Sequence, residues 1–172
     1  MSSIITNKVS ESGLITLDLS TFLPKEEIVS FDIKEYLFME LILKEKDFRN
    51  ALQEKEWSYY ENKIVCIYCS TDAIIPVWAY MLASTFLQPI ATEVYFGNPS
   101  HVKENILLKN IQQTKVEDYL DKRIVIKGCG EEKIPESAYV SITNKLLPVA
   151  KSIMYGEPCS TVPVYKKKSI KI

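Results

Sequence analysis

Two stretches of the 172-residue chain decide its predicted fold: KIVCIYCSTDAIIPVWAYMLASTFLQPIATEVYFGNPS (63–100) and KRIVIKGCGEEKIPESAYVSITNKLLPVAKSIMYGEPCS (122–160). Laid over each other with a shift of 59 positions, they share prolines, glycines and small or aromatic residues: Pro76 with Pro135, Ala79 with Ala138, Tyr80 with Tyr139, Pro89 with Pro148, Gly97 with Gly156, and Pro99 with Pro158. Self-similarity at a fixed spacing is typical of one supersecondary unit that a chain uses twice. The sequence therefore predicts an internal repeat.

Each copy of the repeat has the pattern of a strand, a helix and a second strand. A β-branched apolar run predicts the first strand, a proline marks the start of the helix, and a second apolar run ends in Gly-x-Pro. The expected strands are Ile64–Tyr68, Val94–Phe96, Ile124–Lys127 and Ile153–Tyr155, and the expected helices run from Pro76 to Leu87 and from Pro135 to Leu146. A crossover of this length favours parallel pairing in right-handed βαβ units.

The rest of the chain is predicted to add to this core. Residues 1–60 form an N-terminal extension with strands at Gly13–Leu19 and Glu27–Ile33 and an amphipathic helix at Lys44–Trp57, and we expect it to cover the sheet. The lysine-rich end, residues 165–172, is expected to be a mobile basic tail. The fold class that follows is α/β, a single domain over residues 1–172, with a mostly parallel sheet built from the two repeats.

Composition excludes several classes of protein. Lys and Arg number 21 against 22 Asp and Glu, a net charge of −1, which argues against a dedicated nucleic-acid binder. The longest apolar stretch, residues 74–90, is too short and too polar for a membrane span, and the N-terminus lacks a secretory signal pattern. We therefore expect a cytoplasmic protein without disulfides, whose oligomeric state the sequence leaves open.

The four cysteines are unusual in this otherwise ordinary composition. Cys69, Cys129 and Cys159 each follow a predicted strand, in a polar loop where an apolar filler is not expected. Because ligands of parallel sheets bind outside the carboxyl ends of the strands, the sequence predicts that these three thiols share one site. Cys66 lies inside a strand, so the Cys66-x-x-Cys69 spacing places the two side chains on opposite faces, and we expect Cys66 in the core.

Three thiolates are an incomplete shell for a metal. Glu157 is the expected fourth ligand or a neighbour of the ligands, and Asp72 is the other candidate for the fourth ligand. Asp72, His101 and Ser160 are otherwise expected beside the ligands, at the edge of the site. Thiolate ligation suits an iron–sulfur cluster or iron, with zinc as the alternative. Asp72 is equally explained as a charge near a helix N-terminus, and His101 as an exposed loop residue.

Two other functions fit the same loops. A thiol-based redox protein would use two of the cysteines as a reversible disulfide, and a protein-interaction module would need none of them. The five glycines leave no room for a phosphate-binding loop or a dinucleotide fingerprint. Whether the chain is an enzyme stays open.

Several segments resemble a family of short, uncharacterised cytosolic proteins of Bacteroidota, known as a domain of unknown function. They are LILKEKDFR (41–49), CSTDAIIPVWAYML (69–82), RIVIKGC (123–129), SAYV (137–140) and KSIMYGEPCSTVPVYK (151–166). The resemblance spans nearly the whole chain, and the cysteines of the family's motifs match Cys69, Cys129 and Cys159. Such proteins are often encoded beside the machinery that assembles iron–sulfur clusters, so the resemblance implies a role in cluster assembly or repair, with assembly proteins as partners.

Overall fold

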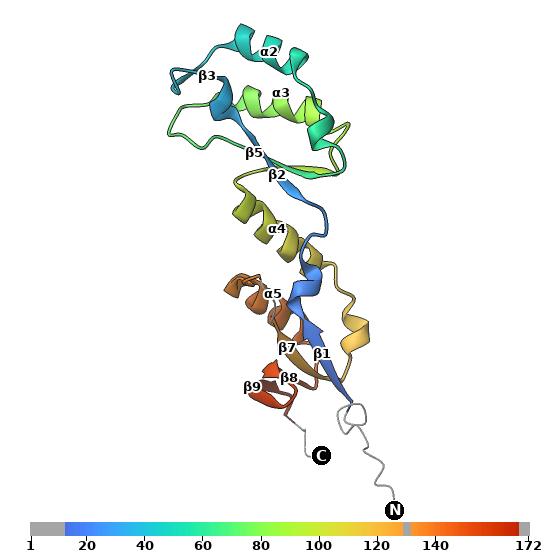
Figure 1. Cartoon of the computed structure of the whole chain (residues 1–172). Helices are drawn as coiled ribbons and strands as arrows, with labels where there is room; N and C mark the ends of the chain where they lie inside the picture. The colour runs from blue at the N-terminus through green and yellow to red at the C-terminus, as the bar shows by residue number, and fades with distance from the viewer. Residues whose placement is uncertain (1–12, 129–131, 169–172) are drawn as a thin grey trace, which may run out of the picture. The chain divides into compact units, whose positions relative to one another are not determined.

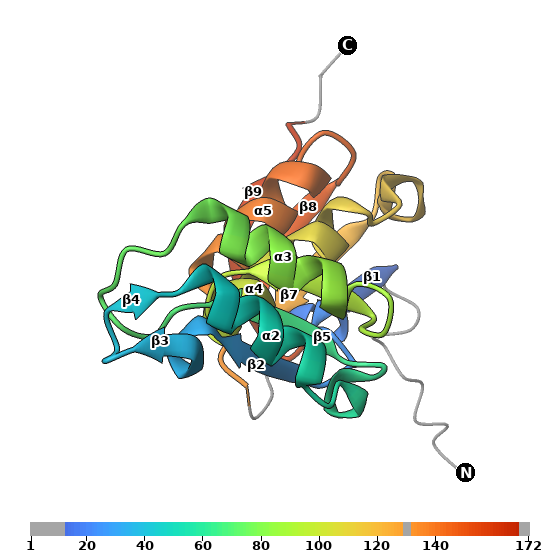
Figure 2. The same cartoon turned by 90° about the horizontal axis from the view of Figure 1, so that it is seen from above.

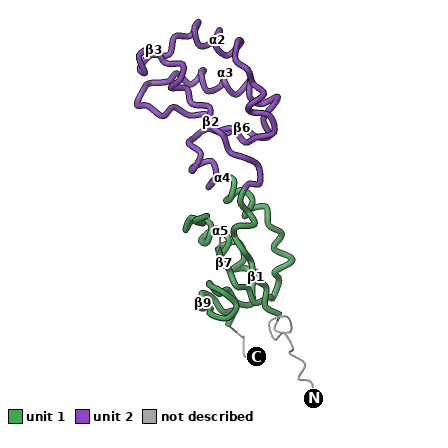
Figure 3. The backbone as a smooth tube through the Cα atoms, in the orientation of Figure 1, with its two compact units in different colours: residues 1–23, 106–172 green, residues 24–105 purple. Residues whose placement is uncertain are grey.

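The computed structural model describes residues 13–128 and 132–168. The chain folds into two compact units (Figure 3). Unit 1 is built from both ends of the chain, residues 1–23 and 106–172, and unit 2 is the continuous stretch 24–105. In the part of the chain that is described, no helix has both the length and the apolar character needed to cross a bilayer.

The elements of each unit follow the chain (Figure 1). Unit 2 contains β2 (Ile28–Asp32), η2 (Ile33–Tyr36), β3 (Leu37–Phe38), β4 (Ile42–Leu43), α2 (Glu45–Glu54), η3 (Ser58–Tyr60), β5 (Ile64–Tyr68), α3 (Val77–Leu87) and β6 (Glu93–Phe96). Unit 1 contains β1 (Leu14–Asp18), η1 (Leu19–Phe22), η4 (Val116–Tyr119), β7 (Arg123–Lys127), α5 (Glu136–Leu146), β8 (Ser152–Glu157) and β9 (Ser160–Lys166). The helix α4 (Pro99–Gln112) belongs partly to each unit.

Unit 2 is a parallel sheet with helices packed on it. Its strand order is β2-β5-β6, and both strand pairs are parallel. The central strand β5 is buried from Ile64 to Ile67, as expected for a continuous apolar run in a parallel sheet. Two views place α2 and α3 side by side over the same face of this sheet (Figures 1 and 2).

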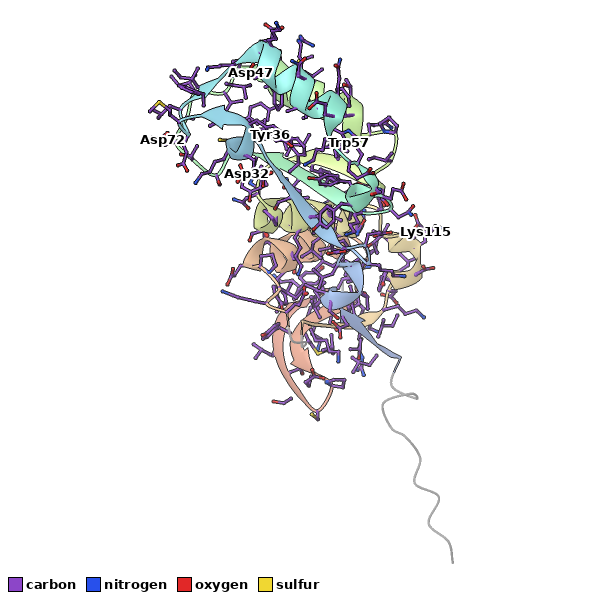
Figure 4. All side chains as sticks on the ribbon, turned by 45° about the horizontal axis from the view of Figure 1, so that its top comes forward. Asp32, Tyr36, Asp47, Trp57, Asp72 and Lys115 are labelled. Atoms are coloured by element: carbon purple, nitrogen blue, oxygen red, sulfur yellow. The ribbon has the colours of Figure 1, made fainter. Side chains whose placement is uncertain are left out.

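Aromatic rings fill the core of unit 2. Phe31 on β2 stacks on Tyr36, with ring centroids 5.4 Å apart, and on Trp57, at 5.8 Å. Trp57 in turn stacks on Phe86 of α3 at 5.4 Å. Figure 4 labels Tyr36 and Trp57 among these side chains. The rings thus join the first strand to the segment after α2 and to α3.

Unit 1 has a mixed sheet of order β1-β7-β8-β9. The first three strands are parallel, and β9 pairs with β8 antiparallel across a turn. Apolar side chains from the strands, from α5 and from the second half of α4 form one core. They are Leu17, Leu19, Leu107, Ile111, Ile124, Ile126, Ile134, Ala138, Ile142, Leu146, Ala150 and Ile153.

The predicted α/β class, the strands and helices of the two stretches and the parallel pairing within each stretch are confirmed, but the prediction of one sheet is wrong. β5 and β6 lie in one sheet, while β7 and β8 lie in another that also contains an antiparallel strand. The N-terminal extension does not merely cover a sheet, because β1 pairs with β7 and β2 pairs with β5. Each strand-helix-strand segment therefore takes its third parallel strand from the N-terminal segment.

The predicted basic tail needs a correction as well. Tyr165 and Lys166 belong to β9, where they pair with Ile153 and Ser152 of β8. Backbone pairing with β8 thus orders residues whose lysine content suggested a free end. Residues 169–172 lie outside the described part of the chain.

Candidate functional site

The cysteines are divided between the two units. Cys69 follows β5 in unit 2 and is partly exposed, and Cys159 is exposed in the turn between β8 and β9 of unit 1. Cys129 lies outside the described residues. The expectation that Cys69 and Cys159 share the edge of one sheet is wrong, because their strands belong to different sheets.

Cys66 is buried in the core, as predicted. Its exposed fraction is 0%, and burial raises the pKa of its thiol to about 11. A thiol in this environment stays protonated at neutral pH. Cys66 is therefore a packing residue of the core.

The other predicted site residues also belong to both units. The Glu157 carboxylate lies 3.8 Å from the Lys127 ammonium, and Ser160 is the first residue of β9, opposite Glu157 across the turn. Asp72 is exposed in the loop between β5 and α3. His101 is exposed in the first turn of α4, where its backbone N–H donates to Asn98 Oδ1 at 2.9 Å.

The donors that are described do not make up a metal site. Among residues 13–128 and 132–168, no three His, Cys, Asp or Glu side chains converge closely enough to hold an ion. Glu157, the expected fourth ligand, has a lysine as its partner. The three-cysteine centre stays a prediction, since Cys129 is not described.

An aspartate stands at the carboxyl end of β2 in unit 2. Asp32 Oδ1 accepts hydrogen bonds from the backbone N–H groups of Lys34 and Ser70, both at 3.0 Å. Burial raises the pKa of Asp32, but the hydrogen bonds from Ser70 and Lys34 outweigh it, so the pKa lies below its usual range. The ionised carboxylate thus ties the cap of η2 to the loop that follows β5. In Figure 4, Asp32 and Asp72 lie toward the same end of unit 2.

Unit 1 has an aspartate at the corresponding end of β1. Asp18 Oδ1 accepts from the Ser20 N–H at 3.0 Å and from its hydroxyl at 2.7 Å, and Asp18 Oδ2 lies 3.6 Å from Lys127 Nζ. Burial opposes ionisation, yet these hydrogen bonds and the lysine lower the pKa of Asp18 overall. Lys127 lies between Asp18 and Glu157, so three charged groups meet where β1, β7 and β8 end.

In both units a tyrosine lies in the first part of the helix, about one turn after the proline that precedes the helix. Tyr80 of α3 contacts Phe96 edge to face at 5.2 Å, and Tyr139 of α5 contacts Tyr155 in the same way at 5.7 Å. Burial raises the pKa of Tyr80, and the charges of Cys69 and Asp32 raise it further. In unit 1, a Cβ at Gly128 would overlap the Tyr139 hydroxyl, so glycine at this position makes room for that ring.

A cavity of about 760 Å³ lies between α5 and the strands of unit 1. Ile126, Ile134 and Ile153 line it with apolar side chains from the core, and Tyr139 and Tyr155 add an aromatic wall. The polar groups that line the cavity are few: Glu132, Lys133, Glu136, Thr143 and Asn144. The space is mainly apolar, with hydrogen-bonding groups in the minority.

The extra strand of unit 1 contributes to this cavity. Val164 of β9 lines it together with Val140 of α5.

The sequence interpretation missed Asp18, Asp32, Lys127 and Tyr155. A signal for the aspartates was present, because LDLSTF (17–22) and FDIKEY (31–36) share an apolar-Asp-apolar pattern that ends in an aromatic residue. Each pattern gives a strand, a capping Asp and a 3-10 helix. The aligned Phe96 and Tyr155 were a second signal.

Comparison with known proteins gives a family. A family model described as "Protein of unknown function (DUF2480)" matches residues 3–167. The chain belongs to the DUF2480 family. The DUF2480 match includes residues of both units, and its description states no activity. No curated protein and no solved structure matches the chain.

Proposed function

We propose that unit 1 binds a small, largely apolar, ring-bearing ligand in the cavity between α5 and the sheet. The observation that carries this proposal is the volume of about 760 Å³ with mainly apolar walls. Cavities that hold small molecules measure about 300–1,000 Å³ and combine apolar walls with a few polar groups. The position also fits, because ligands of parallel sheets bind at the carboxyl ends of the strands.

The lining residues have separate roles in this proposal. Ile126 and Ile153 remove apolar ligand surface from water, and Tyr139 and Tyr155 offer ring edges and faces to an aromatic group. Thr143 and Asn144 on α5 supply hydrogen-bonding groups that orient a polar end of the ligand. These side chains support binding.

A neutral fluorescent probe of apolar cavities, N-phenyl-1-naphthylamine, tests this proposal on the full chain. We expect saturable binding by the wild type and at least about tenfold weaker binding by Val140→Trp, equivalent to about 1.4 kcal/mol, because the indole fills the opening. The matched control is Met81→Trp at the aligned position of α3, which should bind the probe like the wild type. Equal affinity of wild type and Val140→Trp would overturn the proposal.

A metal or iron–sulfur centre on Cys69, Cys129 and Cys159 is the second candidate. The observation that favours it is the accessibility of the two described thiols, since Cys69 is partly exposed and Cys159 is exposed. Cysteines that serve only packing are usually buried, as Cys66 is. The described residues do not complete such a site, so this candidate depends on Cys129.

Anaerobic purification tests the second candidate. Iron with acid-labile sulfide in stoichiometric amounts, and a visible spectrum that is lost when Cys69, Cys129 and Cys159 become Ser, would support a cluster, whereas zinc alone would support a zinc site. Metal-free, colourless protein would refute both. A Cys66→Ser variant is the control, because the buried thiol is not a ligand in this scheme.

We also infer that the two units are copies of one supersecondary unit. Each has a first strand that ends in a capping aspartate, a central strand followed by a loop and a helix, and a third parallel strand. The edge-to-face pairs Tyr80–Phe96 and Tyr139–Tyr155 occupy aligned positions. In this interpretation β9 and the cavity are additions of unit 1.

A further inference from the structure

The sheets of the two units end differently. In unit 1 the third parallel strand, β8, is followed outward by the antiparallel strand β9. In unit 2 the third parallel strand, β6, is the last strand in the order β2-β5-β6. A strand at a sheet edge offers its outward backbone groups to another strand. In unit 1, the strand that occupies the position outside the third parallel strand is antiparallel to it.

Large apolar side chains are exposed beside β6. Phe96 at the end of β6 is 71% exposed, and Met81 and Val77 of α3 are 65% and 73% exposed. The contact of the Tyr80 ring with Phe96 holds α3 and β6 together at this place. We call Val77, Met81 and Phe96 the β6 patch. At the aligned place in unit 1, Val164 of β9 lines one cavity with Val140 and Tyr155, so an antiparallel strand lies beside that surface, and Val140 and Tyr155 are 60% and 51% exposed.

The outermost strand of the unit 1 sheet, β9, contains residues that discourage further pairing, and β6 contains neither proline nor lysine. Pro163 interrupts the donors of β9, and Lys166, Lys167 and Lys168 follow at its end. Proline and lysine are common devices that prevent edge strands from associating. β6 reads EVYF, without proline or lysine.

The backbone of β6 defines a register for a new neighbour. The Gly97 N–H donates to the Ile67 carbonyl of β5 at 3.0 Å. Because backbone groups alternate in direction along a strand, those of Val94 and Phe96 point away from β5. Two copies of β6 in antiparallel pairing centred on Tyr95 bring Val94 of each copy opposite Phe96 of the other. Each such pair exchanges two backbone hydrogen bonds, which gives four in total.

We infer that the chain forms a twofold dimer in which β6 pairs with β6 of a second copy. Residues directly opposite in a sheet have side chains on the same face, so the register places the Phe96 ring beside Val94 of the other copy. The β6 patches of both copies then lie on one face of a continuous six-stranded sheet. A twofold axis suits this pairing because an isologous contact uses the same surface twice.

Sedimentation equilibrium of the full chain tests the inference, at concentrations from about 1 µM to about 1 mM, which span moderate to weak self-association. We expect a concentration-dependent dimer for the wild type. Phe96→Glu should weaken the dimer at least about hundredfold, because the charge enters an apolar contact twice per dimer. The control is Val162→Glu on exposed β9, which should dimerise like the wild type. Circular dichroism checks that both variants keep the wild-type fold.

Hydrogen exchange locates the contact. The Val94 and Phe96 amides should exchange more slowly in concentrated than in dilute wild-type protein, and this difference should vanish in Phe96→Glu. Three results would overturn the inference: a wild type that stays monomeric throughout the range, a Phe96→Glu variant that dimerises like the wild type, or a dimer that Val162→Glu dissociates instead. If the Val94 and Phe96 amides of the wild type exchange at the same rate at every protein concentration, β6 does not pair with a second copy, and the inference is likewise overturned.

Discussion

Replacing Phe31 with alanine is expected to lower the free energy of unfolding of unit 2 by about 3–5 kcal/mol. Phe31 is 1% exposed on β2, and its ring contacts Tyr36, Trp57 and Tyr60. The substitution leaves a cavity among rings that are fixed by one another and cannot collapse into it. The aromatic core then loses the ring that contacts Tyr36, Trp57 and Tyr60.

Urea denaturation followed by tryptophan fluorescence measures this effect. Both tryptophans of the chain, Trp57 and Trp78, belong to unit 2, so the signal reports on this unit alone. Phe38→Ala is the matched control, because Phe38 is 50% exposed at the β3–β4 hairpin and should cost less than about 1 kcal/mol. A loss for Phe31→Ala no larger than that of Phe38→Ala would contradict the core described for unit 2.

The strands and helices could be predicted because their signals are local. The run Ile64–Ile67 is apolar at every position, which is typical of the centre of a parallel sheet, and Pro76 and Pro135 mark helix starts within one residue. Such patterns depend only on neighbouring residues in the sequence, so strands and helices can be predicted from them without knowledge of the tertiary structure.

The partner of each strand could not be predicted in this way. β5 and β7 are both apolar, and nothing in their own residues says whether they share a sheet. The structure pairs each with a strand from residues 14–32, so the thiol-bearing loops after β5 and β8 fall in different units. The prediction of a three-cysteine site assumed that the cysteine loops lie at the edge of one sheet. The observed strand pairing contradicts this assumption, because β5 and β8 lie in different sheets.

β9 was missed because its sequence contains contradictory signals. Pro163 argues against a strand, and the lysines that follow suggest a solvated end. Proline is tolerated at an edge, and the register shift between Ile153 and Met154 shows that the ladder is irregular there. Val164 of β9 lines the cavity of unit 1, so the cavity could not be predicted without this strand.

Replacing Asp32 with alanine is expected to lower the free energy of unfolding of unit 2 by about 2 kcal/mol. The carboxylate accepts from the Lys34 and Ser70 N–H groups, so its loss leaves two backbone donors without their partner and removes the cap of η2. Asp32→Asn is the control, because the amide oxygen can accept both bonds without the charge. We expect Asp32→Asn to lose about half as much, measured by the same tryptophan signal.

The stabilisation by Asp32 should disappear in acid. Its pKa in the folded chain lies below that of the unfolded chain, about 3.9, so the carboxylate contributes its full stability above that value. The contribution is lost as the pH falls through the folded pKa, because the proton then neutralises the acceptor. The difference between wild type and Asp32→Ala should therefore be constant near neutral pH and shrink below about pH 4. Asp32→Asn has no carboxylate to protonate, so its free energy of unfolding should differ from that of Asp32→Ala by the same amount at every pH. If the difference in free energy of unfolding between wild type and Asp32→Ala persists at the lowest pH, ionisation of Asp32 is not what stabilises the loop.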